Sequence, residues 1–473
     1  MKEFFEENEK LSWIQISTDS PYFIDEHGNN WTPIGQNDAI TWPDLAGLFQ
    51  RKNVSQVEGH LAYLAAHGVT CLRIMLEYCQ TEHRYLERPV GRFQPHMVQL
   101  WDDLFTLCEK YKLRILLTPF DTFWMDRRWK FHPYNTLSGG PCKNKSKWLT
   151  DPAMLNAIKN RMTFVTERWG GSGVLFAWDL WNEINPVHAS KKTDEFYYFI
   201  EQISTHVRTL EMQLYGKSHP QTVSIFAPLL LKHDVREIIF RHPNLDFGST
   251  HFYEEKTINY PRNTIDAALS TGNMVRESLV HLPEERPFLD SEHGPIDYFK
   301  KRKKNLPELF DDEYFLHIQW AHLASGGAGG GMRWPYRHPH VLTHGMRWAQ
   351  QNMADFISLI DWKNFRRKNL NDDIQISNPD FAVFGCGDDN QAIVWLLNQA
   401  KSKKTRSKKQ KSDIGQLTVS VPNIKAGFYK IYFWDTVSGK IDIMEIEKRI
   451  EDLSLTFKTS LHNIAIAILP FSK

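Results

Sequence analysis

Two glutamates of this sequence each close an apolar run that has the length and composition of a buried strand. Glu183 ends the segment 176–183, and Glu292 ends the segment 287–292. Carboxylates that close two strands can face each other at one edge of a sheet. Such a pair is what cleavage of a glycosidic bond requires, because one carboxyl donates a proton and the other is the nucleophile or base. The first hypothesis is therefore acid–base chemistry on a sugar bond.

Apolar runs alternate with helical patterns from about residue 30 to residue 360, and they must position these carboxylates. The runs are rich in Val, Ile, Leu and Phe, as parallel strands buried on both faces are. They lie at 31–36, 70–76, 114–118, 175–181, 223–226, 247–251, 287–291 and 330–333. Amphipathic helices are expected at 54–67, 95–111, 152–168, 194–215, 265–279, 313–324 and 343–360. This alternation predicts an α/β fold, a (β/α)8 TIM barrel, rather than an open doubly wound sheet.

The pattern changes after Trp362. Short segments rich in β-branched and aromatic residues are separated there by turn residues. These segments are 382–387, 391–398, 416–422, 427–435, 440–447, 453–459 and 463–470. They predict an antiparallel β-sandwich. We therefore expect a barrel domain over residues 1–362 and an accessory β-sandwich domain over 363–473, docked without a long linker.

Functional side chains of such barrels gather where strands end, and several polar and aromatic residues stand at the expected strand ends. In chain order they are Arg73, Asn182, Glu183, His251, Tyr253, Glu292 and Trp334. This set, with Asn182-Glu183 on the fourth strand and Glu292 on the seventh, resembles the clan of retaining (β/α)8 glycoside hydrolases that includes glycoside hydrolase family 5. The resemblance covers the barrel, roughly residues 20–362.

The resemblance implies a role for each of these residues. Glu183 would be the general acid/base and Glu292 the nucleophile of a double displacement. Arg73 and the Tyr253 hydroxyl would keep the nucleophile ionised through charge and hydrogen bonding. An apolar wall and a nearby negative charge would keep Glu183 protonated. Asn182 would hydrogen-bond the 2-hydroxyl of the sugar.

Three residues of this set also have structural interpretations. Asn182 could simply be a polar residue at a strand end, His251 is as readily a satisfied structural histidine as a sugar contact, and Trp334 could be a core aromatic instead of a platform for a sugar face. Weaker candidates for substrate contact are Asn37 and Asp38 after the first strand, Trp124 after the third, and Arg333 at the eighth.

No cofactor or metal ion is predicted. The glycine-rich segment 326–331 precedes a strand, so it does not have the placement of a phosphate-binding loop. His338, His340 and His344 gather after the eighth strand, but their spacing fits no standard zinc motif. The five cysteines form no CxxC pair, which suits a reducing compartment.

Charge and hydropathy exclude several classes of partner. The 57 basic and 56 acidic side chains give a net charge of +1, so no nucleic acid or anionic membrane partner is expected. The lysine-rich run 401–411 has the pattern of a solvated hairpin loop. No stretch has the ~18 apolar residues of a membrane span. The first ten residues lack the apolar core of a signal peptide, so a cytoplasmic protein is expected, or a secreted one if a signal peptide was removed.

These features together predict a retaining β-glycoside hydrolase that acts on β-linked oligo- or polysaccharides, such as mannan- or glucan-type β-glycosides. Carbohydrate is the expected partner, and a homo-oligomer stays open. One alternative is a non-catalytic carbohydrate-binding protein on the same barrel, against which the presence of both glutamates argues. Another is a transglycosylase, which the sequence does not distinguish from a hydrolase.

Overall fold

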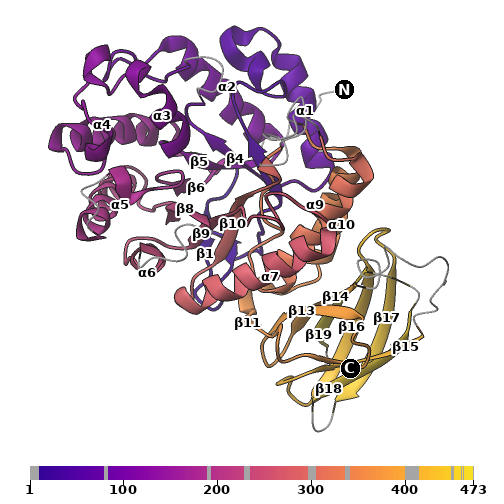
Figure 1. Cartoon of the computed structure of the whole chain (residues 1–473). Coiled ribbons are helices and arrows are strands. Elements are labelled where there is room, and N and C mark those ends of the chain that lie inside the picture. Colours follow the sequence, from indigo (N-terminus) through magenta and orange to yellow (C-terminus); the bar gives the residue numbers. More distant parts are fainter. Residues whose placement is uncertain are drawn as a thin grey trace, which may run out of the picture.

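The computed structural model describes residues 10–78, 84–188, 193–227, 235–296, 305–335, 341–399, 415–448, 452–459, 461 and 463–471. The lysine-rich run 401–411, His338 and His340 lie outside these residues. A part with parallel strands and surrounding helices is followed by a part built of antiparallel strands (Figure 1).

Parallel strands lie at the centre of the first part. Their order is β3 (Gly35–Asp38), β4 (Cys71–Met75), β5 (Arg114–Thr118), β6 (Leu175–Asp179) and β7 (Gln221–Thr222), with a second group of β8 (Ser224–Ala227), β9 (Gly248–Phe252) and β10 (Phe288–His293). Only Val223 separates β7 from β8. On the other side, Arg333 forms parallel bridges with Gln36 of β3 and His293 of β10, and so lies between these strands. Among the described residues, the eighth predicted strand, 330–333, therefore consists only of these two bridges at Arg333.

Helices surround these strands (Figure 1). They are α1 (Val54–Ala66), α2 (Pro95–Lys110), α3 (Thr122–Arg128), α4 (Pro152–Trp169), α5 (Thr193–Tyr215), α6 (Val235–Phe240), α7 (Thr264–His281), α9 (Glu308–Ala324) and α10 (His344–Ile357). Short 3-10 helices are η1 (Ala46–Arg51), η2 (Trp129–Phe131), η3 (Thr136–Ser138), η4 (Lys145–Lys147), η5 (Pro186–His188) and η7 (Trp362–Asn364). Every residue of β4, β5 and β6 is buried, as the apolar runs predict.

Side-chain caps fix where several helices begin. The side chains of Asn53, Asp151, Asn263 and Thr343 each accept a hydrogen bond from a backbone N–H in the first turn of the helix that follows. Asp121 caps α3 in the same way, at the end of β5. The antiparallel pair of β1 (Ile14–Ile16) and β2 (Phe23–Asp25) precedes the first parallel strand. None of the described helices has the length and apolar character needed to traverse a lipid bilayer.

The second part consists of two antiparallel sheets. The six-stranded sheet has the order β11 (Lys368–Asn369), β13 (Phe381–Gly387), β14 (Ala392–Asn398), β19 (Asn463–Pro470), β16 (Gly427–Asp435) and β17 (Ile441–Lys448). The three-stranded sheet has the order β12 (Gln375–Ile376), β15 (Gln416–Val421) and β18 (Leu453–Lys458). One hydrophobic cluster contains Leu417 and Leu455 of the smaller sheet and Val394 and Ile466 of the larger one. All seven strands predicted here are present.

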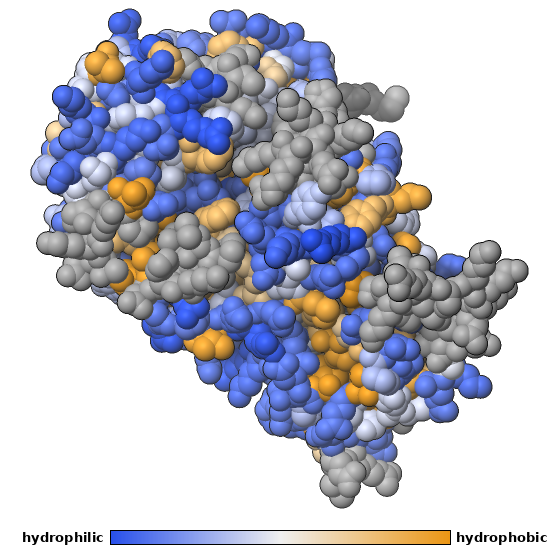
Figure 2. All heavy atoms as spheres, viewed as in Figure 1, coloured by the Kyte–Doolittle hydropathy of each residue, from blue (hydrophilic) through white to orange (hydrophobic). Residues whose placement is uncertain are grey.

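The six-stranded sheet also packs on the helices of the first part. Phe384, Trp395 and Trp434 belong to the same hydrophobic cluster as Trp320 of α9 and Phe356 of α10. The rings of Trp434 and Phe356 meet edge to face with centroids 5.7 Å apart. Polar residues cover much of the face in Figure 2, and hydrophobic residues gather where the helices adjoin the sheets. The predicted docking of the second part is thus an apolar contact, while a domain boundary at 362/363 stays a prediction.

Candidate active site

Glu183 and Glu292, the predicted pair of carboxylates, lie side by side. Glu183 follows β6, and Glu292 lies in β10. One carboxylate oxygen of each lies within 4.8 Å of the other, and a ring nitrogen of His251 lies within the same distance of both. The Glu183 side chain is 18% exposed and that of Glu292 is 8% exposed. The two carboxylates are therefore close together, and Glu183 is the more exposed of the two.

The backbone at Glu183 has an uncommon conformation. Its φ of 49° lies in the left-handed region, which residues other than glycine rarely adopt. The Glu183 N–H donates to the Ser224 hydroxyl at 3.2 Å, which holds this turn in place at the end of β6. Such backbone strain is concentrated at functional sites, where surrounding structure maintains it.

Glu292 is held by two donors. Arg73 Nη1 donates to Oε2 at 2.9 Å, and the Tyr253 hydroxyl donates to Oε1 at 2.6 Å. Burial raises the pKa of Glu292 from its ordinary value, and the charge of Arg73 and the Tyr253 hydrogen bond act against that rise. The two predicted donors are present, although burial outweighs them in the direction of the shift.

Arg73 is itself fixed by buried partners. Its Nη2 donates to Asp179 Oδ2 at 2.8 Å, Nη1 donates to Asn37 Oδ1 at 2.8 Å, and Nη2 also donates to Asn182 Oδ1. Asp179 accepts from the Ser224 hydroxyl at 2.9 Å as well. Sequence reasoning missed Asp179. The signal was available, because a carboxylate inside a fully buried strand requires a buried cation or several donors.

Asn182 links Arg73 to the end of β5. Its carbonyl oxygen accepts from Arg73, and its Nδ2 donates to Asp121 Oδ1 at 2.6 Å. Burial raises the pKa of Asp121 to about 6. Asn182 is 2% exposed, and one N–H of its amide remains beyond the bond to Asp121. The predicted hydrogen bond from Asn182 to a sugar hydroxyl stays a prediction, and this second N–H is the donor that could make it.

His251 lies between the two glutamates. Its Nδ1 is 2.8 Å from Glu183 Oε1 and 3.7 Å from Glu292 Oε2. Burial lowers the pKa of His251 to about 4, so the ring is neutral at neutral pH. A neutral imidazole can donate from Nδ1 to an ionised carboxylate or accept the proton of a carboxylic acid. The His251–Glu183 hydrogen bond can therefore persist in either protonation state of Glu183.

An aromatic group lies beside Glu292. The centroid of the Trp334 ring lies 4.9 Å from that of Trp42 and 5.8 Å from that of Tyr78. The Tyr78 and Trp124 ring centroids are 5.6 Å apart. Burial raises the pKa of Tyr78 well above its ordinary value, and the charge of Glu292 adds to this. Trp334 is 8% exposed and Trp124 is partly buried. The structure thus brings both predicted aromatics together, and it adds Trp42 and Tyr78, which the sequence did not single out.

Asn37 has a different environment from the one predicted. Its Nδ2 donates to the backbone carbonyls of Ser291 at 2.9 Å and Met332 at 3.2 Å, and its Oδ1 accepts from Arg73. The side chain is buried, so its polar atoms join β3 to β10 and to the segment before Arg333. Asn37 orients Arg73 in this geometry, and a sugar contact would require these bonds to change.

Arg333 contacts α9. It is fully buried, its Nη2 donates to Asp311 Oδ1 of α9 at 2.7 Å, and its guanidinium lies over the Tyr314 ring. The contact of Arg333 with substrate stays a prediction, and the structure gives this side chain a partner on α9. The physical reason is that a buried guanidinium requires a buried carboxylate, and α9 supplies one on the outer side of the strands.

A cation at the two glutamates is disfavoured by their neighbours. Glu183, His251 and Glu292 offer three atoms close enough to hold a metal ion. However, Glu292 already accepts from Arg73 and Tyr253, and the guanidinium charge opposes a second cation. His344, which follows the eighth predicted strand, is hydrogen-bonded to the Tyr63 hydroxyl of α1 at 3.0 Å.

Solved structures share this fold. A glycoside hydrolase family 5 structure from Bacteroides vulgatus ATCC 8482 aligns with a TM-score of 0.60 and 10% identity over 98% of this chain and 94% of that one. A family 5 mannosidase from Rhizomucor miehei in complex with mannosyl-fructose aligns with a TM-score of 0.55 and 13% identity over 73% and 97%. An exo-β-1,4-mannosidase from Opitutaceae bacterium strain TAV5 aligns with a TM-score of 0.53 and 16% identity over 73% and 62%.

No protein-family model matches the sequence, and no curated protein sequence matches it significantly. At 10–16% identity the likeness to these structures is a likeness of fold. The resemblance to the clan that includes glycoside hydrolase family 5, predicted from strand-end residues, is confirmed at the level of the fold.

Proposed function

We propose that this protein is a retaining β-glycoside hydrolase, built on a (β/α)8 barrel over residues 1–362 with a β-sandwich over 363–473. The observation that carries the proposal is the approach of Glu183 and Glu292, which have carboxylate oxygens within 4.8 Å of each other. Retaining glycosidases hold their two carboxyl groups ~5–5.5 Å apart, whereas inverting ones leave ~6.5–9.5 Å for a water molecule. A closest approach of two oxygens within 4.8 Å is compatible with the retaining spacing.

In the first step Glu292 attacks the anomeric carbon while Glu183 protonates the departing glycosidic oxygen. The C–O bond breaks, and a covalent glycosyl–Glu292 ester forms. Arg73 and Tyr253 hold the two Glu292 oxygens at 2.9 and 2.6 Å, which aims the carboxylate at the sugar. This orientation supports nucleophilic attack, because a fixed carboxylate avoids the entropy cost of being positioned during the reaction.

In the second step a water molecule attacks the same carbon from the side of Glu183. Glu183 takes the proton of that water, the ester bond breaks, and Glu292 leaves as a carboxylate. The neutral His251 ring can hydrogen-bond Glu183 both before and after proton transfer. We infer that His251 keeps Glu183 in one orientation through the whole cycle.

We propose a β-linked oligo- or polysaccharide as the substrate, with β-mannosides to be tested first. Two solved structures with this fold are described as mannosidases, and one of them holds mannosyl-fructose. The aromatic group of Trp42, Tyr78, Trp124 and Trp334 beside Glu292 supports a sugar-stacking wall. Transglycosylation is the second candidate, since a sugar hydroxyl could replace water in the second step.

The test is the anomeric configuration of the product formed first. Aryl β-mannoside, glucoside, galactoside and xyloside substrates are incubated with the protein, and the product is followed by proton NMR before mutarotation. A β-anomer as the initial product is expected. An α-anomer would indicate inversion, and no turnover of any β-glycoside would favour a non-catalytic binding protein.

A further inference from the structure

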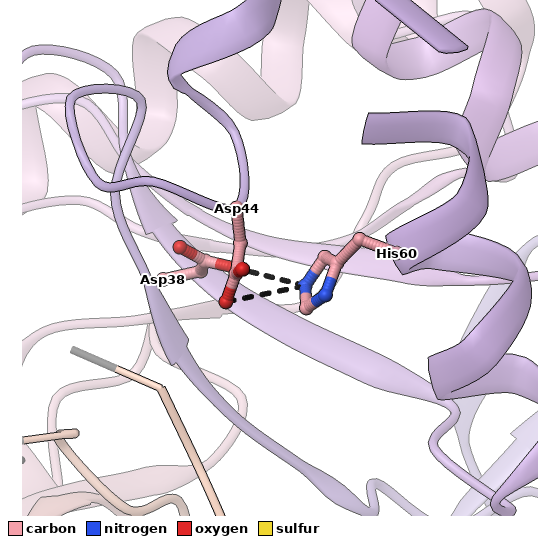
Figure 3. A group of neighbouring side chains, drawn as sticks. All are labelled: Asp38, Asp44 and His60. Carbon is pink, nitrogen blue, oxygen red and sulfur yellow. Dashed lines mark ion pairs between the residues drawn. The ribbon is translucent and has the colours of Figure 1, made fainter. Parts of the chain in front are cut away.

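Three side chains outside the candidate active site converge on one point. Asp38 ends β3, Asp44 lies in the loop between β3 and η1, and His60 lies on α1 (Figure 3). One carboxylate oxygen of each aspartate and one ring nitrogen of His60 all lie within 4.8 Å of one another. The group therefore joins the end of β3 and the loop that follows it to α1.

The spacing of these atoms is too long for hydrogen bonds. His60 Nε2 lies 3.6 Å from Asp38 Oδ2 and 3.9 Å from Asp44 Oδ2. Two buried histidine–carboxylate pairs of the same molecule, His219–Glu211 and His293–Asp290, are at 2.8 Å. The imidazole nitrogen here faces two carboxylates without bonding directly to either (Figure 3).

This spacing resembles the edges of a coordination shell. For ligands about 2.1 Å from a tetrahedrally coordinated ion, neighbouring ligand atoms are about 3.4 Å apart. The observed 3.6 and 3.9 Å lie close to that value. His132 also stands 3.7 Å from Glu77, but that carboxylate oxygen accepts from Arg161 at 3.1 Å and so has a cationic partner.

Two buried atoms of this group have no hydrogen-bond partner among the described residues. The Asp38 side chain is 3% exposed, its Oδ1 accepts from the Ala39 N–H at 2.7 Å, and its Oδ2 has no hydrogen-bond partner among the described residues. His60 Nε2 likewise has none within that part of the chain. The charge of Arg347 reaches both aspartates, but its guanidinium donates to the side-chain amides of Gln36 and Gln350. Buried polar atoms of this kind are costly unless a partner satisfies them.

We propose that Asp38, Asp44 and His60 bind one divalent transition-metal ion of the Zn²⁺ class, with water completing the shell. The donor set indicates the class, because an imidazole nitrogen suits Zn²⁺ and similar ions, whereas Ca²⁺ and Mg²⁺ prefer oxygen ligands throughout. The residue spacing 38, 44 and 60 matches no standard metal motif, so the sequence predicted no ion. This site is independent of the proposed glycosidase chemistry.

The ion would have a structural role. It would fix the loop between β3 and η1 to α1, and this loop carries Trp42. Trp42 packs on Trp334 at 4.9 Å in the aromatic group beside Glu292. Binding would therefore stabilise the folded chain and hold one wall of the candidate active site, without contacting the reacting atoms.

The test is metal binding by the full-length chain after removal of metals with a chelator. Zn²⁺ is titrated by calorimetry, and thermal unfolding is followed with Zn²⁺, Ca²⁺ or Mg²⁺. One Zn²⁺ per chain and a rise in melting temperature with Zn²⁺ alone are expected. The variants Asp44→Asn and His60→Gln should bind Zn²⁺ more than about tenfold more weakly and lose that rise.

A matched control separates this site from the two glutamates. The double variant Glu183→Gln/Glu292→Gln should keep the Zn²⁺ stoichiometry and the thermal shift of the native chain. Co²⁺ provides a second readout, because tetrahedral coordination gives intense visible absorption that the His60→Gln variant should lack. Binding that disappears in the glutamate variant, or that is unchanged in both site variants, would overturn the proposal. So would a native chain that binds neither Zn²⁺ nor Co²⁺.

Discussion

At the scale of single residues, the most specific prediction concerns Glu292. Arg73 and Tyr253 each donate to one oxygen of a nearly buried carboxylate, which is the arrangement of a held nucleophile. We expect Glu292→Ala to lower kcat on an aryl β-glycoside by at least about three orders of magnitude. Added azide should restore part of the rate by occupying the space of the carboxylate. A variant with native turnover would refute the assignment of Glu292.

Glu183 should show the signature of a proton donor. Glu183→Gln keeps an acceptor for His251 but has no transferable proton. The first step should slow by about 10²–10⁴-fold for substrates with poor leaving groups and much less for activated aryl glycosides. The measurement compares kcat/KM across a series of leaving groups. Equal losses along the whole series would argue against general acid catalysis by Glu183.

His251 gives a prediction about pH and stability. Burial lowers its pKa from 6.5 to about 4, so between these values the unfolded chain binds a proton that the folded chain does not. The free energy of unfolding should therefore fall as pH drops from about 6.5 towards 4, by up to a few kcal/mol from this group. Denaturant unfolding of the native chain and of His251→Asn at pH 7 and 4.5 measures the difference. An equal pH dependence in both proteins would contradict it.

At the scale of elements, two buried Arg–Asp pairs have different roles, because one belongs to the candidate active site and the other joins a strand residue to a helix. Arg73–Asp179 joins β4 to β6 and touches Glu292, whereas Arg333–Asp311 reaches α9. Asp311→Asn removes the carboxylate from the buried Arg333 guanidinium and should destabilise the fold by about 3–5 kcal/mol. Asp179→Asn leaves Arg73 with Glu292 as its carboxylate, so it should destabilise the fold by less. Only Asp179→Asn should also reduce kcat, because Arg73 then loses its orientation. Activity and thermal unfolding of both variants test this, and a similar loss of kcat in both would refute it.

Elements with many apolar residues were predictable from the sequence, and short or polar ones were not. The strand at 114–118 and the helix from residue 152 appear where the pattern places them, because burial of apolar side chains dominates their formation. Helices α3 and α6 span only 7 and 6 residues, which is too short for a helical period to be recognised. The resemblance placed Arg73 beside Glu292, and the two side chains are in contact. Asp179 and Asp311 were not identified from the sequence as partners of Arg73 and Arg333, because these contacts join segments that are distant in the chain.

At the scale of the whole molecule, the two parts share one hydrophobic cluster. The sequence predicted that the second part docks, but it did not reveal which strands contact which helices. In the structure Trp395 of β14 is fully buried, and its ring lies 4.9 Å from Phe384 and 5.6 Å from His317 of α9. Asn463 of β19 also hydrogen-bonds His317 at 3.2 Å. The six-stranded sheet is therefore part of the packing that holds α9 in place.

This shared packing predicts that the two parts unfold together. Trp395→Ala removes a large ring from the contact with α9 and should destabilise the chain by about 3–5 kcal/mol. Leu417→Ala is the control, because Leu417 belongs to the cluster between the two sheets, and that cluster contains no residue of the described helices. In the native chain, activity and tryptophan fluorescence should be lost in one thermal transition. In Trp395→Ala both should shift to lower temperature together, since α9 loses its support along with the sheet. If activity persisted after the fluorescence transition, the parallel part would be stable without the sheets.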